Sequence, residues 1–148
     1  MTDVNLANAR DNMVEQQLRT WEVLNERVLS VLGQLARDQF TPHSYRNLAY
    51  ADMQIPLTHG EVMLEPKVEG RILQALDPQP HDRALEIGTG TGFLTACLAQ
   101  LAQQVTSVDC YAEFTQQAGA TLSTQGVRNV DLVTGDAALG WDDGRSYD

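Results

Sequence analysis

The stretch Leu85-Glu86-Ile87-Gly88-Thr89-Gly90-Thr91-Gly92-Phe93 decides the fold. The apolar run at residues 84–87 predicts a short buried strand. Three glycines alternate with threonines after it, and apolar residues then recur at helical spacing from Phe93 to Leu101. A strand, a glycine loop and a helix in this order form a ligand-binding turn of an α/β sheet. Glycine suits that turn because it permits a tight bend and lets the main chain approach a ligand closely.

The glycine spacing and one acid separate two classes of ligand. The dinucleotide fingerprint G-x-G-x-x-G needs a third glycine at position 93, which Phe93 occupies, whereas this loop reads G-x-G-x-G and ends at Gly92. Glu86 stands two residues before the first glycine, where a carboxylate would repel a pyrophosphate but suits a ligand with an ammonium group. S-adenosylmethionine is such a ligand. The stretch therefore resembles the first motif of class I methyltransferases, and a nicotinamide-dependent oxidoreductase is disfavoured.

Two further acids follow predicted strands. Asp109 ends the strand at 105–108, roughly 20 positions after Gly88, where such an acid accepts hydrogen bonds from ribose hydroxyls. Asp136 follows the strand at 130–133, where it can accept from the exocyclic amine of adenine. Plainer interpretations remain open: Glu86 as a partly exposed acid, Asp109 as a helix cap and Asp136 as a turn acid. Three acids at one sheet edge favour a binding site.

The remaining pattern predicts an α/β protein with a doubly wound parallel sheet, Rossmann-like and preceded by N-terminal helices. We expect the sheet to be truncated after its third strand, because residues 145–148 continue no element. Residues 1–80 supply N-terminal helices and a substrate-side loop, and residues 81–148 supply the cofactor-binding α/β portion of one incomplete structural domain. Helices are expected near 9–19, 26–36 (capped by Asn25), 65–76, 93–101 and 112–123, with an irregular segment at 48–60.

The composition limits the kinds of molecule that the chain is expected to bind. The 148 residues carry a net charge of −10 and a single lysine, Lys67, so the surface repels nucleic acid and anionic membranes. No apolar run of about 18 residues and no secretory signal are visible, which favours a cytoplasmic location. Cys97 and Cys110 are too few and too differently placed for a disulfide framework or a metal site, so no metal is expected.

Segments along nearly the whole chain resemble the N-terminal part of the protein-L-isoaspartate O-methyltransferases. They include N-terminal helical segments that most class I methyltransferases do not share. The matching segments are residues 13–18, 26–29, 40–42, 48–52, 55–57, 59–60 and the run from 85 to 136.

This resemblance implies methyl transfer from S-adenosylmethionine to the carboxylate of isoaspartyl residues in damaged proteins, leaving S-adenosylhomocysteine. The implied partner is a protein or peptide that carries isoaspartyl residues; the oligomeric state is left open. The implied cofactor-binding residues are Glu86, Ile87, Gly88, Thr89, Gly90, Gly92, Asp109, Cys110, Asp136 and Ala137.

One loop departs from the family. Where the family reads Gly-Gln-Thr-Ile-Ser, this chain reads Gly60-Glu61-Val62-Met63-Leu64, so Leu64 stands at the position of the active-site serine. Glu61 adds negative charge where an anionic substrate would approach. Thr58 and His59 are candidate polar groups near the methyl, and the catalytic residues stay unknown. The alternative function is a catalytically impaired S-adenosylmethionine-binding relative that acts on another substrate or as an interaction protein.

Overall fold

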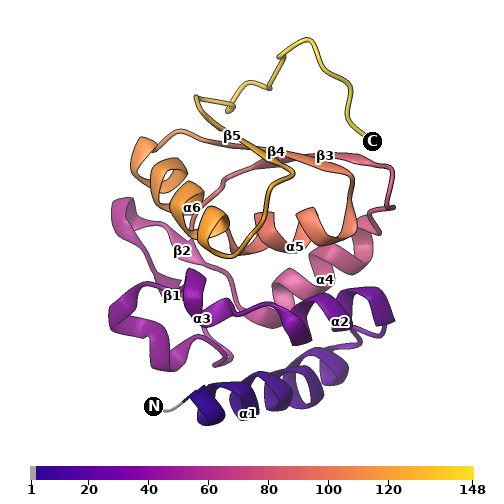
Figure 1. The fold of residues 1–148 in the computed structure, drawn as a ribbon, viewed down its shortest axis with the longest axis vertical. Coiled ribbons are helices and arrows are strands. Elements are labelled where there is room, and N and C mark those ends of the chain that lie inside the picture. The colour runs from indigo at the N-terminus through magenta and orange to yellow at the C-terminus, as the bar shows by residue number, and fades with distance from the viewer. Residues whose placement is uncertain (1–2) are drawn as a thin grey trace. The chain divides into compact units, whose positions relative to one another are not determined.

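The computed structural model describes residues 3–148 and divides the chain into two compact units, Met1–Asp77 and Pro78–Asp148 (Figure 1). The first unit contains helices α1 (Asp3–Met13), α2 (Glu26–Gln34), α3 (Arg37–Phe40) and α4 (Pro66–Leu76), with a hairpin of β1 (Ile55–Pro56) and β2 (Val62–Met63). The second contains β3 (Arg83–Ile87), α5 (Phe93–Leu101), β4 (Gln104–Asp109), α6 (Ala112–Thr124) and β5 (Val130–Thr134). The single domain expected from the sequence stays a prediction.

The first helix begins earlier than the predicted residue 9. It starts at Asp3, and Leu6 extends the buried stripe back from Met13 by seven residues, a spacing that keeps both on one helix face. The helical path continues through a π turn, Val14–Leu18, and a 3₁₀ turn, Arg19–Trp21. Within residues 3–148 no helix is both long and apolar enough to cross a bilayer.

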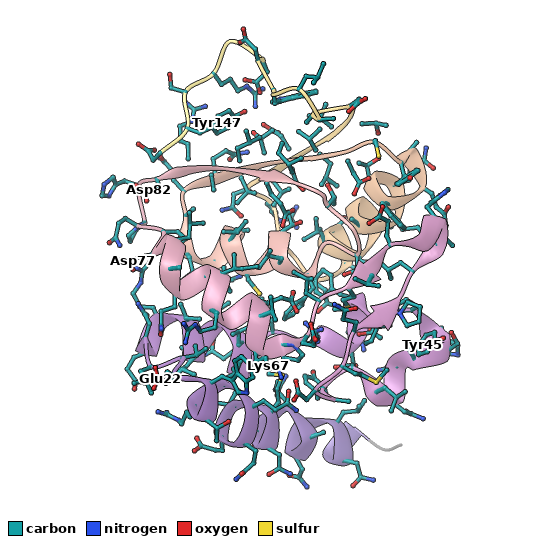
Figure 2. All side chains as sticks on the ribbon, turned by 180° about the vertical axis from the view of Figure 1, so that it is seen from behind. Glu22, Tyr45, Lys67, Asp77, Asp82 and Tyr147 are labelled. Atoms are coloured by element: carbon teal, nitrogen blue, oxygen red, sulfur yellow. The ribbon has the colours of Figure 1, made fainter. Side chains whose placement is uncertain are left out.

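The ends of α2 and α4 follow local chemistry. Asn25 caps α2, because its side chain accepts hydrogen bonds from the backbone N–H groups of Arg27 and Val28, as predicted. Proline starts α4 at its first position, and Asp77 ends it in a left-handed conformation with φ of 46° (Figure 2). Lys67, in the first turn of α4, places its ammonium 4.1 Å from the centre of the Trp21 ring.

The segment at 48–60 is more regular than the sequence suggests. Its end joins a short antiparallel hairpin in which Ile55 faces Met63 and Pro56 faces Val62. Proline is compatible with this hairpin because a two-stranded ribbon has only edge strands, where one N–H needs no ladder partner. The hairpin tip is a 3₁₀ turn, Thr58–Gly60.

A buried ion pair ties the hairpin to the helices of the first unit. The guanidinium of Arg37 is fully buried and bonds the carboxylate of Glu69 in α4. Its Nε donates to the carbonyl of Ala49 at 2.7 Å, and its Nη2 donates to the carbonyl of Leu64 at 2.6 Å. One side chain therefore fixes α3, the segment before the hairpin, the residue after it and α4.

The second unit is a three-stranded parallel sheet in the order β3-β4-β5, with Ile87 opposite Val108 and Asp109 opposite Thr134. Figure 1 shows α5 and α6 on one face of this sheet and the C-terminal tail on the other. The alternation of parallel strands and helices confirms the predicted α/β fold class. The carboxyl ends of all three strands meet at one edge.

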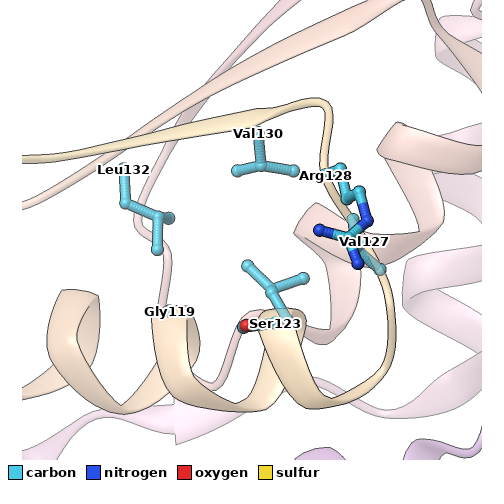
Figure 3. A pocket seen from close by; sticks show the side chains of 7 residues that line it. Gly119, Ser123, Val127, Arg128, Val130 and Leu132 are labelled. Carbon is cyan, nitrogen blue, oxygen red and sulfur yellow. The ribbon is translucent and has the colours of Figure 1, made fainter.

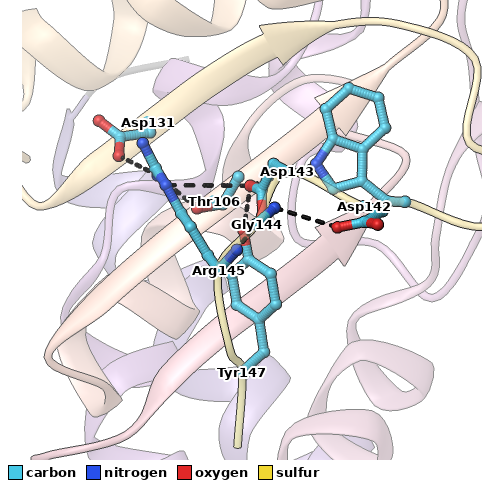
Figure 4. A network of polar contacts seen from close by, with 8 residues as sticks. Thr106, Asp131, Asp142, Asp143, Gly144, Arg145 and Tyr147 are labelled. Atoms are coloured by element: carbon cyan, nitrogen blue, oxygen red, sulfur yellow. Dashed lines mark hydrogen bonds and ion pairs between the residues drawn. The ribbon is translucent and has the colours of Figure 1, made fainter.

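Residues 145–148 form no helix or strand, as predicted, but their contacts anchor the tail to the sheet (Figure 4). Arg145 donates to Asp131 of β5 at 2.9 Å and to the hydroxyl of Thr106 in β4 at 3.4 Å. The backbone N–H of Asp148 donates to the carbonyl of Arg83, whose own N–H donates to the Asp148 carboxylate, both at 2.9 Å. These contacts were not visible in the sequence because they join residues far apart along the chain.

The glycine loop, residues 88–92, requires glycine at its last position for two reasons. Gly92 has a φ of 86°, which side chains rarely adopt, and it directly precedes α5. A Cβ at this residue would lie 2.9 Å from the Cβ of Ala118 in α6. The absence of a side chain therefore lets the loop touch α6.

We predict that Gly92→Ala lowers the free energy of unfolding by about 3 kcal/mol, because it adds both left-handed strain and a clash with Ala118. Gly126→Ala is the matched control: Gly126 also has a positive φ, 75°, but its Cβ would meet nothing within 4 Å. The control should lose about 1 kcal/mol, from backbone strain alone. Urea unfolding measures both variants, and equal losses would contradict the packing role of Gly92.

A second prediction concerns Glu69. Burial raises the pKa of this carboxyl from 4.5 to about 7, against the opposing pull of Arg37. Between those pH values the unfolded chain releases the Glu69 proton while the folded protein keeps it. The free energy of unfolding should therefore fall as the pH rises from about 4.5 to about 7 and change little above that range, by an amount on the order of 3 kcal/mol.

Glu69→Gln should remove this pH dependence, because an amide does not titrate. Glu26→Gln is the control, since Glu26 is exposed at the start of α2. Denaturant melts across this pH range give the difference between each variant and the parent protein. If the free energy of unfolding of Glu69→Gln fell with pH as steeply as that of the parent protein, other titratable groups would be responsible for the effect.

Candidate functional site

The predicted acids lie at the carboxyl end of the parallel sheet. Glu86 is the penultimate residue of β3, Asp109 is the last residue of β4, and Asp136 follows β5 by two residues. The register, with Ile87 opposite Val108 and Asp109 opposite Thr134, brings these strand ends level. In open α/β sheets this edge is where ligands bind.

Glu86 lies under the glycine loop and is 7% exposed. Its Oε1 accepts hydrogen bonds of 2.5 Å from the hydroxyls of Thr95 in α5 and Ser107 in β4. The Ser107 hydroxyl also lies 2.6 Å from that of Thr89 in the loop. Oε1 thus connects β3, β4 and the first turn of α5, and its two hydrogen bonds offset part of the cost of burying this acid.

Asp109 holds the glycine loop from the neighbouring strand. Its Oδ2 accepts a hydrogen bond of 3.0 Å from the backbone N–H of Gly90, and its Oδ1 accepts one of 3.0 Å from that of Tyr111. Tyr111 is the N-cap residue of α6, and no described side chain caps this helix, so the bond from Tyr111 makes Asp109 a turn acid rather than a helix cap. Asp109 also contacts the loop that the sequence assigns to a ligand.

Asp136 is exposed, and its Oδ1 accepts a hydrogen bond of 2.9 Å from the backbone N–H of Ala138. This is the geometry of a turn acid. The neighbouring candidates differ in exposure: Ile87 is 55% exposed and Cys110 is exposed, whereas Ala137 is partly covered. A short aliphatic surface at Ile87 therefore borders the acids.

The first glycine of the loop leaves open space. Gly88 has a φ of 99°, and a Cβ built on it would meet no heavy atom within 4 Å. Its N–H donates to the carbonyl of Val108 at 2.7 Å, which fixes the loop to β4. Gly90 also has a positive φ, 54°. Gly88 thus exposes backbone at the edge, whereas Gly92 serves packing.

The substrate-side candidates belong to the hairpin of the first unit. Thr58, His59 and Glu61 are exposed at or beside its tip, and His59 adopts a left-handed conformation with φ of 60°. The N–H of Leu57 donates to the carbonyl of Glu61 at 2.8 Å and closes the turn. Leu64, at the family serine position, is partly exposed, and its carbonyl is held by Arg37.

A hollow in the second unit lies away from the strand-end acids. It has a volume of about 320 Å³ and lies between the last turns of α6 and the first half of β5 (Figure 3). Leu122, Val130 and Leu132 supply apolar walls, and Arg128 stands at its side. The candidate acids are at the opposite end of the strands. Among residues 3–148 no cluster of three His, Cys, Asp or Glu side chains could hold a metal ion.

Two groups of buried polar residues were not predicted from the sequence. The hydroxyls of Thr95 and Ser107 had a usable signal, because a polar residue within a buried strand or on the inner face of a helix needs a partner. Arg37 and Glu69 had none, since they are separated by 32 positions and each falls within an ordinary polar pattern.

Comparison with known proteins identifies the family. Residues 8–148 match the family model described as "Protein-L-isoaspartate(D-aspartate) O-methyltransferase (PCMT)". The chain is 36% identical over 142 residues to protein-L-isoaspartate O-methyltransferase 1 of Rhodopseudomonas palustris, covering 96% of this chain and 58% of that protein. It is 39% identical over 136 residues to a protein-L-isoaspartate O-methyltransferase of Aeropyrum pernix, covering 89% and 52%.

A solved structure supports the same fold. A protein-L-isoaspartate O-methyltransferase superposes with a TM-score of 0.77 at 22% identity, over 94% of this chain and 46% of that chain. The chain thus spans little more than half the length of the curated relatives that it matches. The match to the family model over residues 8–148 and the identities above lead to one conclusion: the chain belongs to the protein-L-isoaspartate(D-aspartate) O-methyltransferase family.

Proposed function

We propose that this chain binds S-adenosylmethionine at the carboxyl edge of its sheet and takes part in methylating the carboxylate of isoaspartyl residues in damaged proteins. The observation that carries the proposal is the open backbone at Gly88 beside the strand-end acids, in a chain of this family. The reaction, the substrate and the protein partner are inferences from the family, because the chain covers 58% of its relative from Rhodopseudomonas palustris.

The residues present suit this cofactor. The candidate set contains three carboxylates and no lysine or arginine, so its charge favours a ligand with a sulfonium and an ammonium over a pyrophosphate. The open space at Gly88 admits an atom group close to the main chain. Asp109 and Asp136 would accept hydrogen bonds from the ribose and from adenine, and Glu86 would favour the ammonium through its charge.

The proposed reaction needs no general acid or general base from the chain. The bound cofactor would supply an electrophilic methyl group on a positively charged sulfur. An acceptor carboxylate is already ionised near pH 7, so no general base is needed. The contribution of the chain is orientation: Asp109 and Gly88 fix the glycine loop, and Arg37 fixes the hairpin through the Leu64 carbonyl.

The hairpin carries the strongest argument for the alternative, a catalytically impaired relative. Leu64 cannot donate the hydrogen bond of the family serine, and the exposed Glu61 repels an anionic acceptor. The backbone at Leu64 is nevertheless held by a buried arginine. The backbone of the hairpin is therefore held in place. The side chains of Glu61 and Leu64 decide between an active methyltransferase and an impaired relative.

We predict that S-adenosylhomocysteine raises the melting temperature, because a ligand that binds only the folded state stabilises it by about 2.7 kcal/mol at a hundred times its Kd. Asp109→Asn should reduce the shift, because it removes the negative charge and replaces one of the two acceptor oxygens with an NH2 group, which cannot accept a hydrogen bond. Asp142→Asn, in the exposed tail, is the control and should keep the full shift. A shift with NADH and none with S-adenosylhomocysteine would reverse the assignment.

Methylation of an isoaspartyl peptide by the full-length protein tests the substrate. We expect turnover with the isoaspartyl peptide and none with the matched aspartyl peptide. Leu64→Ser and Glu61→Gln together should raise the rate, because they restore a hydroxyl and remove a repelling charge. Cofactor binding without turnover in the parent protein, and with turnover restored by these two changes, would support the impaired relative instead.

A further inference from the structure

A polar pocket in the first unit is lined by none of the hairpin residues. It has a volume of about 300 Å³ and lies between α1, α3 and the turn that ends at Tyr50. Leu6 and Ala7 of α1 form an apolar wall, whereas Arg10, Asp38 and Arg46 supply charge. Two of the ten basic residues of a chain with a net charge of −10 therefore line one small pocket.

The acid in this pocket already has its full set of partners. Asp38 Oδ1 accepts a hydrogen bond of 2.8 Å from the Tyr50 hydroxyl, and Oδ2 accepts from Arg46 Nη2 at 3.1 Å and from the Gln39 amide at 3.0 Å. Burial alone would raise the pKa of Asp38, but the bonds from Tyr50, Arg46 and Gln39 hold it below the usual value. Asp38 is therefore an anion that Arg46 neutralises.

The positive charge of Arg10 is not neutralised by Asp38, which already pairs with Arg46. Among the side chains of residues 5–148 Arg10 forms no ion pair with a carboxylate, and its Nη1 donates a long hydrogen bond, 3.3 Å, to the carbonyl of Gln34. Its Nε is buried and has no hydrogen-bond acceptor among the described residues. A buried guanidinium N–H without an acceptor is costly, and a native protein normally satisfies such a group with an ion, a ligand or water.

We propose that this pocket binds the carboxylate of a small aliphatic acid, with Arg10 as the anchoring residue. Two guanidinium groups and one carboxylate leave a single positive charge, which matches a monoanion better than a phosphate dianion. The planar fork of arginine fits a carboxylate in two-point contact. Leu6 and Ala7 offer the short alkyl chain of such an acid an apolar surface. This proposal does not rest on the methyltransferase function.

The carboxylate can come from a free short-chain acid or from the C-terminus of a peptide. Titration of the intact protein with propionate, and separately with a short alanine peptide and its C-terminal amide, distinguishes these sources. Sodium chloride keeps the ionic strength constant. Nuclear magnetic resonance of the arginine Nε–H groups reports directly on Arg10, and we expect its signal to move and saturate with propionate or with the free-acid peptide.

Arg10→Gln should weaken propionate binding by at least about tenfold, because a hydrogen bond to a charged group is worth that factor or more. Arg128→Gln, which removes an exposed arginine of the second unit, should bind propionate as the parent protein does. The melting temperature of each variant without ligand confirms that it is folded. Equal movement with chloride, equal binding of the amidated peptide, or unchanged affinity in Arg10→Gln would overturn the proposal.

Discussion

The second unit depends on one buried carboxylate, that of Glu86. Its Oε1 accepts hydrogen bonds from hydroxyls of α5 and β4, which offset part of the cost of burying a polar group. Those donors come from elements that the glycine loop connects or borders, so the same hydrogen bonds that accommodate this acid also fix the loop. Asp109 adds a second hold through the N–H of Gly90. The hydrogen bonds of Glu86 and Asp109 thus determine the geometry of the glycine loop.

The first unit uses the opposite arrangement, a buried cation that collects carbonyls. Arg37 bonds Glu69 and the backbone at Ala49 and Leu64, so it determines the path of the chain on both sides of the hairpin. A guanidinium is suited to this because its five donors lie in one rigid plane. The side chain at residue 64 can therefore change without loss of the backbone arrangement, since the contact with Arg37 uses only the Leu64 carbonyl.

Elements of both units could be predicted from the sequence where their signals are local. Alternating apolar runs gave the three parallel strands, and Asn25 marked the start of α2. The start of α1 was placed too late because, among residues 5–12, Leu6 alone is buried. The bonds of Arg37 and the anchoring of the tail at Arg83 were unpredictable, since each joins residues more than 10 positions apart with no periodic pattern.

The contact between Gly92 and α6 has a consequence for recognition. Because the loop touches the helix with no side chain between them, it cannot rearrange without displacing α6 and the sheet beneath. For the cofactor site proposed at this edge, the binding surface would be formed before the ligand arrives, and little conformational entropy would be lost on association. Selectivity at such a site would then depend on the ligand's shape and charge rather than on induced fit.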